Sequence, residues 1–296
     1  MSGVTVPSPF FVQRVLLEAV EPVHMGTGAY GLGRVDLAIA REPGTRLPKV
    51  PGTSLHGAIR SYAAYRHGDR RCGGVGLTGR GHCTRPECPV CYTFGHVKGV
   101  EGGNSGTVSI GDARILLFPV HSMAGPVWVT TPEILAEFGV VLTLQDRNKV
   151  ALGKALKDRA YLNLGWLMLE RDQEVDTTAL PPQIPAIVRD NVAVVSAGLF
   201  SRVVNSNLEV RTSVGINPDT GAADDQALFT YEAIPRAAFM WTEVIEDDYR
   251  TERFTPTNGW KRPLDVVWAG LEWVQYLGVG GMGTRGFGRL RAWKIA

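Results

Sequence analysis

The stretch PGTSLHGAIR, residues 51–60, decides the fold that this sequence predicts. A proline, a glycine and two hydroxyl residues in succession are typical of a helix start, and Thr53 or Ser54 is the expected capping residue. Leu55 and Ile59 begin an apolar face at helical spacing, so we expect a helix that buries this face. The free amides of its first turn and the two hydroxyl groups indicate an anion site, although an ordinary helix cap explains them equally well.

Strand patterns flank this helix on both sides, and the same order returns near the end of the chain. Residues 10–21 and 107–120 predict strands, and residues 263–277 predict a second long helix that is followed by a strand at 287–295. Strand, helix and strand, then insertions, then a second strand, helix and strand is the order of a ferredoxin-like, RRM-type core. The predicted fold class is therefore α+β.

The remaining segments predict insertions into a single domain that spans residues 1–296. We expect a Cys-rich loop at residues 67–106, a helical region at 131–206 and a long β-hairpin at 207–235. Thr131-Pro132 is a strong helix start, and the apolar residues within 191–205 also favour a helix. Residues 24–33 contain four glycines and predict a glycine-rich loop.

The composition excludes several classes of protein. The chain has 296 residues, of which 44% are hydrophobic and 20% charged, as in a globular protein and unlike a disordered or fibrous chain. No apolar stretch is long enough to span a bilayer, and the first nine residues do not resemble a secretory signal, so we expect a cytoplasmic protein without a membrane partner.

The net charge of +2 hides two basic segments. Residues 56–96 hold six arginines and two acidic residues, and residues 280–296 hold three arginines, one lysine and no acidic residue, so each segment has a charge of +4. Two local basic zones on a near-neutral protein suit a defined polyanion track. Arginines on ordinary solvated faces are the alternative.

Four cysteines lie within twenty residues, at Cys72, Cys83, Cys88 and Cys91. The last two are separated by two residues, which is the spacing at which two thiolates chelate one metal ion. We expect a structural zinc site that all four complete, with His67 or His82 as possible substitutes. A disulfide, a redox pair and free thiols remain alternatives, although a reducing compartment disfavours a disulfide.

Two further motifs carry polar chemistry. Residues 280–288 contain a formal GxGxxG pattern, but it follows a helix rather than a strand, so it is not a dinucleotide site. Such a loop can still bring amides to a phosphate, with Arg285 and Arg289 nearby, or it is simply a tight turn. Asp36 follows the first glycine-rich loop, where it can bind a divalent metal or a ribose hydroxyl, or form a surface ion pair with Arg34 or Arg41.

Three stretches together, residues 51–60, 88–95 and 280–288, resemble the signature of the RAMP superfamily of CRISPR proteins. Residues 33–42, 111–120, 128–132 and 231–235 resemble, more specifically, the repeated backbone subunit of type III-B (Cmr) effector complexes. The equivalent subunit of type III-A (Csm) complexes is the nearest rival.

This resemblance implies a function. Several copies would stack along one guide RNA together with other Cmr subunits, and the hairpin would act as a thumb in the duplex of guide and target RNA. Complementary target RNA would be cut at regular intervals, which leaves 2′,3′-cyclic phosphate and 5′-hydroxyl ends and uses a divalent cation such as Mg²⁺ or Mn²⁺. A scaffold subunit that does not cut, and a nuclease that processes guide precursors with His24 as its base, are the alternatives.

The resemblance also assigns site residues. Asp36 matches the family's loop aspartate, and His24, Tyr231 and Glu232 lie in stretches that match other catalytic candidates. The family often has a lysine at the position of His56, so Arg60 is expected to supply that contact. The RNA-binding candidates are Arg41, Gly52, Thr53, Ser54, His56, Arg60, Gly281, Gly283, Arg285 and Arg289.

Overall fold

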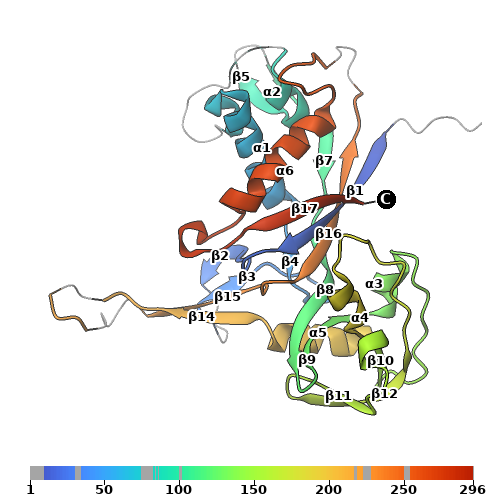
Figure 1. Cartoon of the computed structure of the whole chain (residues 1–296). Coiled ribbons are helices and arrows are strands. Elements are labelled where there is room, and N and C mark those ends of the chain that lie inside the picture. Colours follow the sequence, from blue (N-terminus) through green and yellow to red (C-terminus); the bar gives the residue numbers. More distant parts are fainter. Residues whose placement is uncertain are drawn as a thin grey trace, which may run out of the picture.

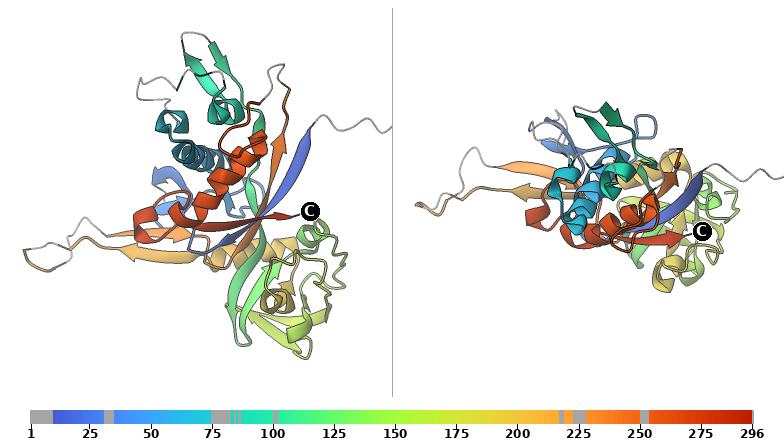
Figure 2. Two further views of the ribbon diagram at one scale, coloured as in Figure 1. Left: turned by 45° about the horizontal axis from the view of Figure 1, so that its top comes forward. Right: turned by 90° about the horizontal axis from the view of Figure 1, so that it is seen from above.

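A sheet of eleven strands runs through the molecule, and two long helices cover one face of part of it (Figures 1 and 2). The computed structural model describes residues 10–30, 35–74, 83, 85, 87–99, 102–216, 219–222, 228–249 and 254–295. In sheet order the strands are β11 (Tyr161–Leu164), β12 (Leu167–Glu174), β10 (Val150–Leu152), β13 (Val192–Val194), β9 (Gly125–Thr130), β8 (Ala113–Ser122), β16 (Phe239–Glu246), β1 (Phe11–Ala19) and β17 (Leu290–Ile295). Two short strands, β4 (Lys49–Val50) and β7 (Val108–Ile110), pair with β8 and β16.

Strand β1 is buried on both faces, because hydrophobic cores lie on the two sides of the sheet. Val15 and Leu17 belong to the core beneath the helices α1 (Gly52–His67) and α6 (Pro263–Leu277). Leu16, between them, belongs to a second core that includes residues of the 131–206 region. Alternate side chains of a strand point to opposite faces, which explains this division. The predicted helix 263–277 is confirmed at both ends.

The start of α1 differs from the prediction. The helix begins at Gly52, and Pro51, which occupies the capping position, has no side chain that can accept a hydrogen bond. The expected caps, Thr53 and Ser54, lie inside the first turn. The carboxylate of Asp112 takes their place, because its Oδ1 accepts a hydrogen bond from the Gly52 amide at 2.7 Å.

The helical prediction for residues 131–206 is wrong in larger part. The helices there are short, namely α3 (Pro132–Ala136), the 3₁₀ turn η2 (Lys154–Leu156), α4 (Ala186–Asp190) and α5 (Ala197–Ser206), and β10 to β13 extend the main sheet. Residues 192–194 form a central strand between β9 and β10. A short apolar run is ambiguous between strand and helix, and here its β-branched residues favour the strand. Thr131 caps α3 as expected, since its Oγ1 accepts from the Ile134 amide at 3.3 Å.

A separate sheet of four strands projects from the body (Figure 1). Its order is β14 (Glu209–Ser213), β15 (Phe229–Ala233), β3 (Leu37–Ile39) and β2 (Gly26–Tyr30). The antiparallel pairing of β14 with β15 agrees with the two strands expected around the turn-rich segment. Residues 24–33 are not all loop, because β2 lies within them. Residues 217, 218 and 223–227 of the intervening segment lie outside the described residues.

The Cys-rich segment packs against α1, and its described residues form little regular structure. It consists of the 3₁₀ turn η1 (Arg70–Gly73), the helix α2 (Pro89–Phe94) and the strands β5 (His96–Gly99) and β6 (Gly102–Asn104). His82, a possible metal ligand, lies outside the described residues. No helix in the described parts of the chain combines the length and apolarity that crossing a membrane requires.

Candidate functional site

Asp36 is held in place at the base of the projecting sheet by Thr230 of β15. Its Oδ2 accepts hydrogen bonds from the Thr230 amide at 2.7 Å and from the Thr230 hydroxyl at 2.9 Å. The Asp36 amide donates in return to Thr230 Oγ1 at 3.1 Å. These bonds lower the pKa of the Asp36 carboxyl, the one from the Thr230 amide most. The exposed side chain is therefore an oriented carboxylate, and no described residue donates a hydrogen bond to its Oδ1.

The other catalytic candidates lie close to Asp36 in the fold, but they are buried. His24 is 5% exposed, and its Nδ1 lies 2.7 Å from the carbonyl oxygen of Glu232. Tyr231 packs edge-on against His24 and Phe287, with ring centres 6.0 and 5.5 Å apart. The structure therefore brings these residues together at the base of the hairpin without presenting them on one surface with Asp36.

Glu232 and Arg41 satisfy each other in the interior. Arg41 Nη1 and Nη2 donate to the two carboxylate oxygens of Glu232 at 2.5 and 2.8 Å. Glu232 also accepts from the Ile39 amide at 2.9 Å, and Arg41 Nε donates to Asn205 Oδ1 at 2.9 Å. Paired in this way, the two residues join β3, β15 and α5. An RNA contact by Arg41 or a proton transfer by Glu232 would have to break this pair.

The glycine-rich loop 280–288 is a compact turn, formed partly as η3 (Gly283–Arg285), that packs on His24. The Gly281 amide donates to the His24 carbonyl oxygen at 3.0 Å, and a Cβ at Gly280 would lie 2.5 Å from the same oxygen. Gly283 has open space where a Cβ would stand. Arg289 turns back to the body, since its Nε donates to the Gln275 carbonyl oxygen at 3.0 Å. The loop thus has a clear structural role beside any role in binding phosphate.

Arg285 is the residue of this loop that reaches the hairpin. Its Nη1 donates to Ser213 Oγ at 3.3 Å, and its guanidinium lies 5.3 Å from the centre of the Phe229 ring. Arg211 of β14 similarly lies 4.7 Å from the centre of the Phe287 ring. Thr230, Arg211, Phe229 and Phe287 are not among the site residues predicted from the sequence. The alternation of aromatic and polar residues from 229 to 232 is the signal that could have indicated the two faces of β15.

The RNA-binding candidates of α1 occupy a second region. Gly52 donates its amide to Asp112, so part of the predicted anion site is filled by a carboxylate of the chain itself. Thr53 is exposed and Ser54 partly buried. The His56 ring is half-buried, and burial together with Arg60 lowers its pKa, which favours a neutral imidazole. Arg60 donates from Nε to the carbonyl oxygen of Cys72 at 2.7 Å.

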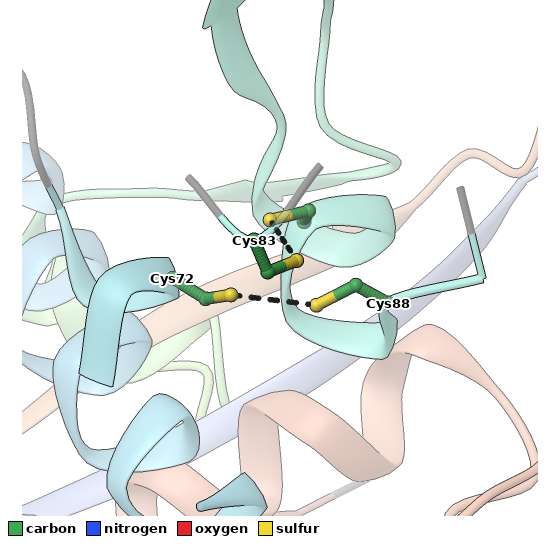
Figure 3. Close-up of side chains that lie close together, drawn as sticks. Cys72, Cys83 and Cys88 are labelled. Carbon is green, nitrogen blue, oxygen red and sulfur yellow. Dashed lines mark hydrogen bonds between the residues drawn. The ribbon is translucent and has the colours of Figure 1, made fainter. Parts of the chain in front are cut away.

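The four cysteines converge on one point (Figure 3). All are buried, and their sulfur atoms lie within 4.8 Å of one another. Cys72 and Cys88 are 3.6 Å apart, and Cys83 and Cys91 are 3.9 Å apart. A tetrahedral zinc ion with Zn–S bonds of about 2.3 Å needs sulfur atoms about 3.8 Å apart. The cluster can therefore hold a metal ion such as zinc.

His67 is not part of this cluster. Its Nδ1 lies 3.0 Å from Asn258 Nδ2, and its ring lies beside that of Trp260. Among the cysteines, hydrogen bonds from Cys72 and then Cys91 lower the pKa of the Cys88 thiol, so a thiolate is favoured at that position. Four sulfur ligands complete a tetrahedral shell, which is the arrangement of a structural site.

This chain is similar to known proteins in sequence and in architecture. The model of the RAMP superfamily matches residues 16–291. The CRISPR system Cmr endoribonuclease Cmr4 of Pyrococcus furiosus is 25% identical over 254 residues, which cover 77% of this chain and 79% of that protein.

Solved structures agree with this match. A chain of the type III-B Cmr-beta complex in its apo state has a TM-score of 0.67 at 15% identity and covers 96% of this chain and 97% of its own length. A chain of the Cmr-beta complex bound to cognate target RNA has a TM-score of 0.63 at 18% identity, and the match covers 95% of this chain and 97% of that chain. Oligomeric Cmr4 from Pyrococcus furiosus has a TM-score of 0.62 at 18% identity, and the match covers 96% of this chain and 99% of that chain. The resemblance predicted from the motifs is confirmed, and because the family model spans nearly the whole sequence, this chain belongs to the RAMP superfamily.

Proposed function

We propose that this chain is the repeated backbone subunit of a type III-B CRISPR effector complex, which binds guide RNA and cleaves complementary target RNA. The exposed, oriented carboxylate of Asp36 carries the proposal, in a chain similar over most of its length to an endoribonuclease. Guide RNA, target RNA, further copies of the chain and other Cmr subunits are its partners, and the cytoplasm is its location. The equivalent subunit of a type III-A complex is the alternative assignment.

The architecture supports a ferredoxin-like palm and a thumb. Four strands in the order β17-β1-β16-β8 are antiparallel to their neighbours, and α1 and α6 follow β1 and β16 in the chain. This is the arrangement of a βαββαβ core. The pair β14–β15 projects from the body, and Val210 of β14 and Leu228, just before β15, present apolar side chains to solvent, which suits a wedge between base pairs.

The proposed cleavage uses the RNA's own 2′-hydroxyl group. The 2′-oxygen forms a bond to the adjacent phosphorus, and the bond from phosphorus to the 5′-oxygen breaks. The proton of the 2′-hydroxyl passes to a water molecule, and the leaving 5′-oxygen takes a proton from water. The protein holds the splayed nucleotide so that these atoms are in line. Mg²⁺ in proteins keeps several waters and often uses one carboxylate plus substrate phosphates, so Asp36 Oδ1 fits such an ion, which would offset the charge of the transition state.

His24 does not suit a nuclease that processes guide precursors. Such an enzyme needs a base that reaches its substrate, and His24 is 5% exposed beneath residues 280 and 281. The structure therefore favours the backbone subunit over this alternative.

The test of the proposed function is cleavage by the assembled complex of a target RNA complementary to its guide. We expect evenly spaced cuts, each with a 2′,3′-cyclic phosphate end, and no cut where a single 2′-deoxynucleotide replaces the attacking nucleotide. A target that is not complementary is the control. Cutting that continues at the deoxynucleotide would contradict the chemistry, and bound but intact target would favour the scaffold alternative.

We also propose that the four cysteines hold one structural zinc ion. Four thiolates around Zn²⁺ leave a net negative charge, and the guanidinium of Arg71 lies near enough to Cys72 and Cys83 for their charges to raise its pKa, after the larger effect of Asp69. Arg85 pairs with the same Asp69 carboxylate at 3.2 Å.

Metal analysis should find about one zinc ion per chain. The variant Cys88→Ser should lose this zinc and should unfold at a lower temperature than the wild type. A metal-free wild-type protein of full stability would contradict this.

Thr230→Val should move the pH dependence of cleavage. Valine removes the hydroxyl bond to Asp36 Oδ2 but keeps the backbone amide bond. Both bonds lower the pKa of Asp36, so the loss of one bond raises this pKa. As the pH is lowered, the variant therefore loses its ionised, active carboxylate at a higher pH than the wild type does. The acid limb of the rate profile should therefore move upward in pH, whereas Thr230→Ser should retain the wild-type profile. Identical profiles for Val and Ser would contradict the role of the hydroxyl.

A further inference from the structure

Two RNA-binding candidates on α1 touch the Cys-rich segment. Arg60 donates from Nε to the carbonyl oxygen of Cys72 at 2.7 Å, and the next residue, Ser61, donates from Oγ to the carbonyl oxygen of Gly73 at 2.9 Å. One turn earlier in the helix, the His56 ring meets the ring of Phe94 edge-on, with centres 5.1 Å apart. The same part of α1 thus carries both candidates and the contacts that orient them.

The elements that make these contacts meet at the four cysteines. Cys72 lies in η1, whereas Cys91 and Phe94 lie in α2. The backbone of η1 lies directly against α1, since a Cβ at Gly73 would be 3.3 Å from the Cα of Ser61. Both elements are short and leave few internal hydrogen bonds, so a metal ion bound by the four sulfur atoms would fix where η1 and α2 lie against α1.

The bond to Cys72 leaves part of the Arg60 guanidinium available. A guanidinium is planar with five N–H donors in fixed directions, so anchoring Nε also sets where the two Nη groups point. No described residue accepts a hydrogen bond from these Nη groups. A phosphate that meets them encounters donors that are already ordered, which reduces the entropy lost on binding.

We propose that the metal-bound Cys cluster acts as a brace for RNA binding. It holds the carbonyl of Cys72 and the ring of Phe94 in the positions that orient Arg60 and His56 toward the phosphate backbone of guide RNA. Loss of the metal releases both side chains and weakens RNA binding. The inference rests on the proposed function, and it adds a second role to a site whose own chemistry is structural.

The test measures the affinity of the full chain for guide RNA before and after metal removal, in the wild type, Arg60→Ala and Arg66→Ala. Arg66 is a matched control, because it lies on the same helix but donates to the carbonyl oxygen of Ala269 in α6 at 3.0 Å. Metal removal should weaken RNA binding by about tenfold in the wild type and in Arg66→Ala. This factor is what the loss of one charge-assisted hydrogen bond is expected to cost in affinity. Arg60→Ala, already weakened by a similar factor, should lose less affinity on metal removal than the wild type, because only the His56 contact remains to be released.

Equal weakening of RNA binding in all three proteins would indicate general loosening of the Cys-rich segment and would overturn the proposal.

A second variant tests the proposal without metal removal. Arg60→Lys keeps the charge but loses the anchored Nε, so it should lose most of the affinity that Arg60→Ala loses while retaining its metal. Wild-type affinity in Arg60→Lys would overturn the brace. A metal-loaded wild type that binds no guide RNA would overturn the proposed function, whereas RNA binding that ignores metal removal overturns the brace alone.

Discussion

Asp36→Ala should reduce target cleavage by the assembled complex at least about 100-fold, the scale expected when a positioned catalytic group is removed. Binding of guide and target should change little, because the side chain is exposed and its partners in the described structure are the amide and hydroxyl of Thr230. Cleavage should fall because none of the other candidates near Asp36 is exposed enough to replace its carboxylate. These candidates are His24, Tyr231 and Glu232. Cleavage rates and RNA affinities measured on the same preparations test both parts.

Asp176→Ala is the matched control for this variant. Asp176 is also exposed, and bonds to the amide and then the hydroxyl of Thr178 lower the pKa of its carboxyl in the same way. It lies in the 131–206 region rather than at the hairpin, so its loss should leave cleavage unchanged. Unchanged cutting in Asp36→Ala would assign the chain to the scaffold alternative and move the nuclease to a partner subunit. Loss of RNA binding in Asp36→Ala would instead make the residue part of the binding surface.

The parts of the fold predicted from the sequence are those with local causes. Helix 263–277 has a proline at its first position and an apolar face at helical spacing, and both signals lie within the helix itself. The start of α1 could not be predicted in the same way. The Asp112 carboxylate that accepts from the Gly52 amide is 60 residues away in the chain. Residues 192–194 are buried between β9 and β10, and that pairing overrides any helical preference.

The candidate sites also differ in whether their residues lie close together in the sequence. The four cysteines lie within twenty residues, so their convergence could be predicted from spacing, and the structure places their sulfur atoms together. Thr230 is 194 residues from Asp36, and Glu232 is 191 residues from Arg41, so no local pattern could pair them. The resemblance to the family drew attention to Asp36, but only the fold indicates what holds it.

Gly270→Ala should strongly destabilise the protein. A Cβ at this position of α6 would lie 2.2 Å from the carbonyl oxygen of Ile59 and 2.8 Å from its carbonyl carbon. These are backbone atoms of α1 that cannot move without shifting the helix, so the expected loss of unfolding free energy is about 3 kcal/mol, at the upper end for overpacking. Thermal or chemical unfolding measures the loss. Because α1 also carries His56 and Arg60, a helix displaced by the new methyl group should bind RNA less tightly as well.

Gly57→Ala adds the same methyl group to α1 itself and should have the opposite effect on stability. Gly57 is exposed within the helix, and nothing lies within 4 Å of a Cβ at its position. Alanine there should raise the unfolding free energy by roughly 0.5–1 kcal/mol through helix propensity. Both substitutions improve helix propensity. If they change the unfolding free energy in opposite directions, the difference can arise only from the contact between α1 and α6. If both stabilise the protein, α1 and α6 do not approach each other at Gly270 as closely as the structure shows.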